Sequence, residues 1–280
     1  MSNQTFFLST DAQDSVQATL SLPNGVPFPE WYTFFMDYRT PTIIAALYAT
    51  VVHFINSRLP PRQTAARQPS SRPFKAFVFA HNLALCIFSI IVCRGIKRGL
   101  QESWSHYEGR VHDWYCDTDK FLFERAYNSL GYWGYLFYLS KFYEIIDTVI
   151  ILLKGRRSST LQTYHHTGAI LCMWAAMNYM AISVWGFVQI NSFIHSVMYF
   201  YFALTSIGLY PPGKKYITTM QITQFLVGIG IALSSVLIPK CVTAPGSRFA
   251  VWLNIAYLIP LTYLFFDFAI RSYGRKAKRQ

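Results

Sequence analysis

The chain has 280 residues, of which 52% are hydrophobic, 18% aromatic and only 14% charged. A soluble domain of this length carries more charge, so the composition indicates a polytopic membrane protein. The formal net charge of +12 does not indicate nucleic-acid binding, because the basic residues sit in short loops between apolar runs. That distribution is the positive-inside pattern of membrane proteins, whose basic loops face the anionic cytoplasmic leaflet.

Seven apolar runs of near-spanning length follow a polar segment at the N-terminus and predict transmembrane helices. Residues 1–30 have no basic segment before an apolar core, so we expect no signal peptide. The expected spans are 40–58, 74–95, 130–153, 161–181, 184–206, 217–238 and 249–270. The sequence thus predicts an N-terminal tail at 1–39, a seven-helix membrane domain at 40–270 and a basic tail at 271–280.

The positive charges decide the expected orientation. They gather after the first, third and fifth spans and in the C-terminal tail: Arg58, Arg62, Arg67, Arg72, Lys75, Lys154, Arg156, Arg157, Lys214, Lys215, Arg271, Arg275, Lys276, Lys278 and Arg279. We expect these segments to be cytosolic, and the acidic N-terminal tail and the mixed loop at 96–129 to be lumenal. Cys116 and Cys241 then both lie in lumenal loops, and because the lumen permits oxidation we expect a disulfide between them.

Polar clusters interrupt several of the predicted spans. The first is Lys141, Glu144 and Asp147, which are three residues apart and share a broad helix face. A charge at the bilayer centre costs about 2.5–3.5 kcal/mol on insertion scales, so such residues normally face the protein interior and are functional. They form either a buried ionic clasp between helices, or a site with Lys141 at a phosphate or carboxylate and the acids orienting imidazoles.

The second cluster lies at the start of the fourth span. Gln162, His165 and His166 are at i, i+3 and i+4, which places them on one helix face. A lone histidine in a membrane helix is usually a satisfied core residue, but an adjacent pair behind a glutamine indicates chemistry.

The third cluster lies on the fifth span. Asn191, His195 and Tyr199 recur every four residues, and with Phe202 they predict one stripe. A tyrosine stripe alone would indicate packing, whereas the asparagine and the histidine within it indicate function. Further polar residues on predicted spans are His81, Asn82, Gln221 and Gln224.

Histidine boxes in membrane enzymes support two kinds of chemistry. In desaturases and hydroxylases imidazoles bind two iron ions, and some of these boxes begin with glutamine. That site uses about eight histidines in three boxes, whereas this chain has seven histidines in all and no HxxxH pair. In the other chemistry imidazole is itself the nucleophile or base and needs only a neighbour to fix its tautomer. The sequence favours the second, with no metal site.

Four ordered motifs resemble those of the membrane-bound fatty acid elongases, the ELO family of 3-ketoacyl-CoA synthases. They are KFYEIIDT at 141–148, QTYHH at 162–166, NSFIHSVMYFY at 191–201 and TTMQITQF at 218–225. The resemblance implies condensation of malonyl-CoA with a long-chain acyl-CoA to give 3-ketoacyl-CoA, carbon dioxide and CoA, with no cofactor. It also implies an all-α fold of seven transmembrane helices, six of them ringed around an acyl tunnel in the endoplasmic reticulum membrane.

The resemblance also implies roles for the polar residues. His165, with His195 opposite, would take the acyl group, and His166, Asn191 and Tyr199 would position or stabilise oxyanions. The supporting residues are Lys141, Glu144, Asp147, Gln162, Gln221 and Gln224.

The first box position is histidine in most elongases and Gln162 here. Similar glutamine variants occur among elongases of polyunsaturated acyl chains, so we expect a polyunsaturated substrate. The last five residues, 276–280, have the K-x-K-x-x form of an endoplasmic reticulum retrieval signal. The expected partners are acyl-CoA, malonyl-CoA, membrane lipid and the ketoreductase, dehydratase and enoyl reductase of the elongation cycle.

Two other functions remain open on the sequence alone. A di-iron desaturase or hydroxylase would contain iron, which metal analysis of the pure protein detects. A non-enzymatic seven-helix transporter or receptor would form no product from malonyl-CoA.

Overall fold

The computed structural model describes residues 25–60, 71–124 and 129–274. The short helix α2 (Pro29–Met36) precedes α3 (Arg39–Arg58) and α4 (Arg72–His106). The remaining helices are α5 (Val111–Cys116), α6 (Phe121–Glu124), α7 (Leu130–Tyr143), α8 (Ile145–Leu153), α9 (Thr160–Asn178), α10 (Val184–Ser206), α11 (Lys214–Leu237) and α12 (Pro245–Ala269), which ends in a π-helical turn, Ile270–Gly274. The described segments contain no β-strand, so the predicted all-α class is confirmed.

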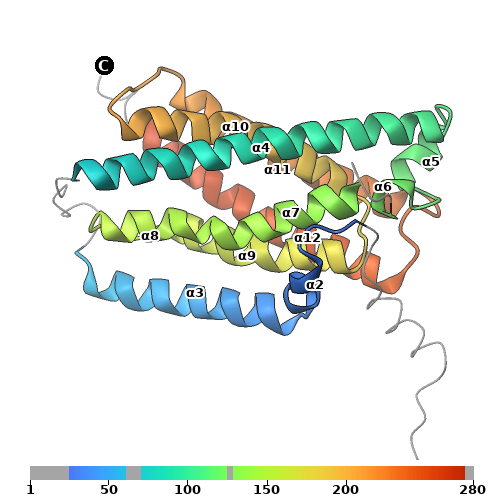
Figure 1. Ribbon diagram of the computed structural model, residues 1–280, viewed down its shortest axis with the longest axis horizontal. Coiled ribbons are helices and arrows are strands. Elements are labelled where there is room, and N and C mark those ends of the chain that lie inside the picture. Colours follow the sequence, from blue (N-terminus) through green and yellow to red (C-terminus); the bar gives the residue numbers. More distant parts are fainter. Residues whose placement is uncertain (1–24, 61–70, 125–128, 275–280) are drawn as a thin grey trace, which may run out of the picture.

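Six long elements form a closed ring in which each packs against the next. The order is α4, α10, α11, α12, α9 and α7, and α7 returns to α4. Helix α8 continues α7, and α3 packs against α9 from outside the ring. Figure 1 accordingly places α3 along one edge of the molecule and α4 and α10 along the opposite edge. Within the described residues, the expected arrangement of six ring helices and one outer helix is present.

Four helices of the described segments are long and apolar enough to cross a membrane. These are α4, α10, α11 and α12 with its final turn. The other three predicted spans correspond to α3, to α7 with α8, and to α9. These elements combine apolar stretches with polar or charged residues, such as Gln162, His165 and His166 on α9, which lower their hydropathy. The chain is a multi-pass membrane protein.

The second predicted span, 74–95, is too short. Helix α4 continues to His106 and has 35 residues, which is about 52 Å of helix against a hydrocarbon core of about 30 Å. Ile96 and Ser103 in the added turns are completely buried. Packing against neighbouring elements therefore keeps α4 helical beyond residue 95, where the sequence is less hydrophobic. The predicted loop at 96–129 contains the end of α4 together with α5 and α6.

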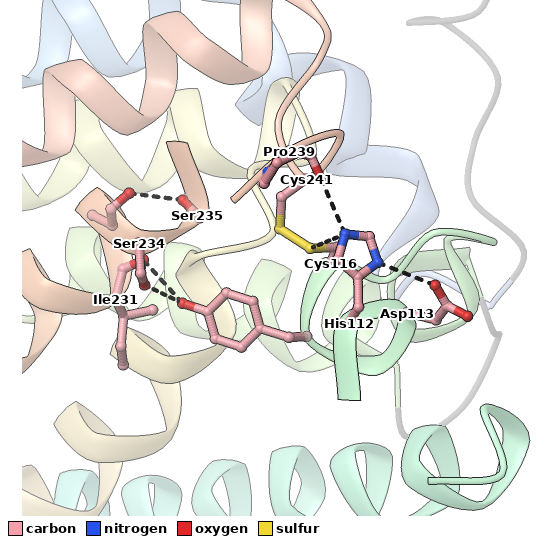
Figure 2. The surroundings of a disulfide bond; sticks show 10 residues. His112, Asp113, Cys116, Ile231, Ser234, Ser235, Pro239 and Cys241 are labelled. Carbon is pink, nitrogen blue, oxygen red and sulfur yellow. Dashed lines mark hydrogen bonds and ion pairs between the residues drawn. A yellow bond between two sulfur atoms is a disulfide. The ribbon is translucent and has the colours of Figure 1, made fainter. Parts of the chain in front are cut away.

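Helix α5 is tied to the end of α11 and to the loop that follows it. Cys116 and Cys241 form a disulfide with an S–S distance of 2.11 Å, which Figure 2 shows. The Tyr115 hydroxyl donates to the carbonyl of Ile231 at 3.1 Å. A covalent bond and a hydrogen bond therefore fix the position of α5.

His112 adds a third connection beside the disulfide (Figure 2). Its Nε2 lies 3.0 Å from the carbonyl of Pro239, and its Nδ1 lies 3.2 Å from a carboxylate oxygen of Asp113. These acceptors, the carbonyl first and the carboxylate second, raise the pKa of His112. Both ring nitrogens face oxygen atoms, so the doubly protonated imidazolium is the form that this arrangement favours.

Candidate active site

The histidine pair lies in the first two turns of α9, and the chain fixes that helix end in two ways. The hydroxyl of Ser159 caps the helix by accepting from the N–H of Gln162 at 3.1 Å. Just before the cap, the Asn56 amide of α3 makes two hydrogen bonds with the backbone of Ser158, at 3.0 and 2.9 Å. A local cap and a tether to α3 therefore decide where α9 begins and where its histidines point.

Gln162 holds His166 one turn further along α9. The amide Nε2 of Gln162 lies 2.8 Å from Nε2 of His166 and 3.4 Å from the hydroxyl of Thr148. That hydroxyl also bonds to Tyr48 at 2.8 Å. His166 is buried, and its Nδ1 has no hydrogen-bond partner among the described residues. The contact thus fixes the ring by one nitrogen and leaves the other available.

His165 is held by a different residue, Tyr257 of α12. The Tyr257 hydroxyl lies 3.0 Å from Nδ1 of His165 and 3.0 Å from the backbone oxygen of the same histidine. Tyr257 is itself buried. Nδ1 of His165 is therefore bonded to protein, whereas Nε2 has no hydrogen-bond partner among the described residues.

Asp147 of α8 binds side chains of two ring helices, α4 and α10, through one carboxylate. One oxygen lies 2.8 Å from Nε2 of His81 on α4, and the other accepts from the hydroxyl of Tyr199 on α10 at 2.8 Å. The second ring nitrogen of His81 lies 3.3 Å from the Tyr143 hydroxyl. Asp147 thus orients an imidazole, as the functional interpretation of this cluster expects, and the imidazole is that of His81.

Lys141 and Glu144 form an ion pair with an N–O distance of 2.6 Å. Their side chains are each only 3% exposed, so both charges are removed from solvent. The ammonium also lies 3.8 Å from the ring centroid of Phe137, and the same Glu144 oxygen accepts from Ser140 at 3.1 Å. Lys141 is therefore neutralised by a carboxylate one turn away, at the C-terminal end of its own helix. The charges are buried as the ionic-clasp interpretation expects, but this pair does not join two helices.

The predicted stripe on α10 is buried over its first three members. Asn191, His195 and Tyr199 are all buried, whereas Phe202 is 40% exposed. The spacing keeps Phe202 on the same helix face, but it lies near the end of α10 at Ser206, where this face is no longer covered. The rings of His195 and Tyr199 are 5.5 Å apart, so these two form a pair inside the bundle.

The two glutamines of α11 contact α10. The side-chain oxygen of Gln224 accepts a hydrogen bond from the Asn191 amide nitrogen at 3.4 Å. The side-chain oxygen of Asn191 is buried and has no hydrogen-bond partner among the described residues. Gln221 lies 3.1 Å from the sulfur of Met198. Both glutamines therefore support α10, and neither contacts a histidine.

The three candidate catalytic histidines come together inside the ring. The rings of His165 and His166 are 5.2 Å apart, and His195 is buried within electrostatic range of both histidines and of Lys141. The four residues derive from α7, α9 and α10, and α7 packs against both of the other two helices. Within the described segments, no three His, Cys, Asp or Glu side chains are grouped so that they could hold a metal ion. The arrangement suits direct imidazole chemistry.

Sequence reasoning missed Tyr257, Tyr48 and the supporting role of Thr148. Tyrosine and threonine are ordinary residues in apolar helices and carry no distinctive signal there. The sequence also did not reveal the close contact between the Tyr257 ring and the α9 backbone at Gly168, one turn after His165. A Cβ atom added at Gly168 would lie 2.2 Å from the Tyr257 ring, so the glycine allows that ring to approach α9.

Comparisons with known proteins show the family of this chain. A family model described as the GNS1/SUR4 family, ELO, matches residues 33–280. A protein of Dictyostelium discoideum named as a fatty acid elongase is 32% identical over 272 residues, which is 94% of this chain and 86% of that protein. Very long chain fatty acid elongase 5 of Bos taurus is 31% identical over 87% of this chain and 77% of its own.

A second Dictyostelium discoideum protein, fatty acid elongase sre1, is 29% identical over 87% of each chain. The family model covers nearly the whole chain, and relatives above 30% identity extend over most of its length. The match includes the helices that carry the buried histidines, the ion pair and the Asp147 cluster. The chain therefore belongs to the GNS1/SUR4 (ELO) family of fatty acid elongases, which are condensing enzymes of the 3-ketoacyl-CoA synthase class.

Proposed function

We propose that this chain joins malonyl-CoA to a long-chain acyl-CoA through an imidazole of its buried histidine cluster. The observation that supports the proposal best is the meeting of His165, His166 and His195 inside the helix ring, where Tyr257 and Gln162 hold two of the rings. Removal from water strengthens interactions with developing charge, which acyl transfer requires.

The proposed reaction has two stages. In the first, His165 attacks the thioester carbonyl of acyl-CoA, an acyl-imidazole forms, and CoA leaves as its thiolate, which takes up a proton. In the second, malonyl-CoA loses carbon dioxide, and the resulting enolate carbon attacks the acyl carbonyl. The imidazole is released, and the product is a 3-ketoacyl-CoA two carbons longer. His195 faces the reacting group, and His166 and Asn191 position it or stabilise its oxyanion. Tyr199 has a positioning role, because its hydroxyl donates to Asp147 and its ring lies 5.5 Å from that of His195.

CoA does not cross a bilayer, so we propose that the site opens toward the cytosol. His165 lies soon after the basic segment with Lys154, Arg156 and Arg157, whose charges suit CoA phosphates. The same charges support a cytosolic C-terminus and a lumenal N-terminus. The acyl chain would then occupy a tunnel within the helix ring, directed toward the lumenal end.

We also propose that the chain lies in the endoplasmic reticulum membrane. We propose that it cooperates with a ketoreductase, a dehydratase and an enoyl reductase, because these activities consume the 3-ketoacyl product. The K-x-K-x-x sequence predicted as a retrieval signal lies outside the described residues. A polyunsaturated acyl chain is the proposed substrate because Gln162 replaces the histidine of most elongases.

Membranes that contain this chain should incorporate label from the methylene carbon of malonyl-CoA into a 3-ketoacyl product. Malonyl-CoA labelled at the free carboxyl should instead release its label as carbon dioxide. We expect more product from polyunsaturated than from saturated acyl-CoA of equal length. The assay uses membranes without the chain as the control and omits reductant, so that the first product accumulates. Absence of any product over the panel would contradict the condensing role, and a preference for saturated chains would contradict only the substrate assignment.

Gln162→Ala should lower the condensation rate about 5- to 100-fold, because a buried imidazole nitrogen of His166 loses its partner at a cost of about 1–3 kcal/mol. Gln162→His should retain substantial activity, since a neutral imidazole can make the same bond. Initial rates on one saturated and one polyunsaturated acyl-CoA give both comparisons. Wild-type rates for Gln162→Ala on both substrates would remove the positioning role of this residue and the substrate assignment based on it.

A further inference from the structure

The Tyr257 hydroxyl makes two contacts with a single residue. It lies 3.0 Å from the backbone oxygen of His165 and 3.0 Å from Nδ1 of the same side chain. The residues are 92 positions apart in the chain and come from α9 and α12. This pairing has a chemical consequence, because a hydroxyl group has only one hydrogen to donate.

The number of hydrogens that the Tyr257 hydroxyl can donate decides which nitrogen of His165 carries the proton. A backbone carbonyl can only accept, so the phenolic hydrogen of Tyr257 is donated to the oxygen of His165. The contact at Nδ1 is then a hydrogen bond only when Nδ1 carries a hydrogen and donates it to the phenolic oxygen. The reverse allocation would leave two oxygen atoms facing each other at 3.0 Å without a hydrogen between them.

We infer that Tyr257 is a positioning residue that holds His165 in the Nδ1–H tautomer and leaves the lone pair of Nε2 as the attacking atom. The inference rests on the proposed function, in which His165 takes the acyl group. It adds the identity of the reacting nitrogen and of the residue that selects it.

The surroundings of Tyr257 restrict its ring to this position. The ring lies against the α9 backbone at Gly168, where an added Cβ would come within 2.2 Å of it. It also stacks on Tyr164 one turn earlier in α9, with ring centroids 5.6 Å apart and planes at 24°. A glycine and an aromatic ring of the same helix thus form a slot that directs the hydroxyl to His165.

The neighbouring histidine has no equivalent constraint. His166 is held by the amide of Gln162, and an amide can present either its N–H or its oxygen after a flip. Both neutral tautomers of His166 can therefore be paired. Tyr257 has given its only hydrogen to the backbone and can pair one tautomer alone, which distinguishes His165 as the histidine prepared for attack.

Tyr257→Phe tests the inference, because it retains the ring and removes only the hydroxyl. We expect kcat to fall about 10- to 100-fold, as loss of a buried hydrogen bond that acts in the transition state would require. The KM values for acyl-CoA and malonyl-CoA should stay within about twofold, because substrate binding is not involved. The thermal midpoint of the purified protein should remain close to that of the wild type.

Tyr263→Phe is the control on the same helix. Tyr263 of α12 is 70% exposed, so kcat should stay within about threefold of the wild type. The inference is overturned if Tyr257→Phe keeps wild-type kcat, if its defect lies in KM, or if its midpoint falls together with its rate. Measuring His165→Ala in the same assay separates failure of the proposed function from failure of the inferred role of Tyr257. Activity in His165→Ala contradicts the proposed function. An inactive His165→Ala together with a fully active Tyr257→Phe contradicts only the role of Tyr257.

Discussion

Replacement of His165 by alanine is expected to abolish condensation while the protein still inserts and folds. In the proposed reaction this side chain provides the attacking atom, and no other described residue is held in the same way against Tyr257. Removal of a nucleophile or base commonly lowers rates by at least about 100-fold. His195→Ala should have a comparable effect, because His195 is buried in the same cluster. Product formation from labelled malonyl-CoA measures both.

The control for these variants is His53→Ala, which removes an exposed histidine of the outer helix α3 and should leave activity unchanged. A second measurement examines the first stage alone. Labelled acyl-CoA without malonyl-CoA should transfer label to the wild-type protein and not to His165→Ala. Near-wild-type turnover in either active-site variant refutes the mechanism, and an inactive His165→Ala without labelling of the wild type indicates a one-step reaction with His165 as base.

Breaking the Lys141–Glu144 pair should have the largest effect on stability. Both side chains are 3% exposed and the N–O distance is 2.6 Å, so Lys141→Met or Glu144→Gln leaves one charge buried alone. That loss typically costs about 3–5 kcal/mol. The double variant Lys141→Met/Glu144→Gln removes both charges and should regain much of the lost stability, because a neutral buried pair carries little desolvation cost. Thermal midpoints in detergent give the three values.

An exposed pair provides the comparison. Asp267 and Arg271 are separated by 2.7 Å, with side-chain exposures of 36% and 74%. Asp267→Asn should change stability by at most about 1 kcal/mol, as is usual for solvated ion pairs. Equal effects of Glu144→Gln and Asp267→Asn would show that the Lys141 site is solvated. A double variant less stable than either single variant would show that the pair stabilises the fold beyond mutual neutralisation.

The sequence by itself determined the features that depend on local periodicity and composition. Apolar run length indicated the membrane class and all seven long elements, since a helix needs about 20 apolar residues to span the bilayer. The spacing of Gln162, His165 and His166 placed them on one helix face, because residues three and four apart are neighbours on a helix. These inferences need no knowledge of how the helices pack.

Only the tertiary structure decided which partner each polar group has. The spacing of Lys141, Glu144 and Asp147 allowed either a clasp or a ligand site, and the fold pairs the first two and directs the third to His81 on α4. The length of α4 also depended on burial of its last turns.

Tyr257 is the clearest example of a residue that the sequence could not reveal. It lies 92 positions from His165, and the contact depends on the rotation of α12 about its axis and on the absence of a side chain at Gly168. Hydropathy and spacing record what one helix presents on its surface. They do not record which surface of another helix faces it, and in this protein that facing decides which imidazole nitrogen remains free.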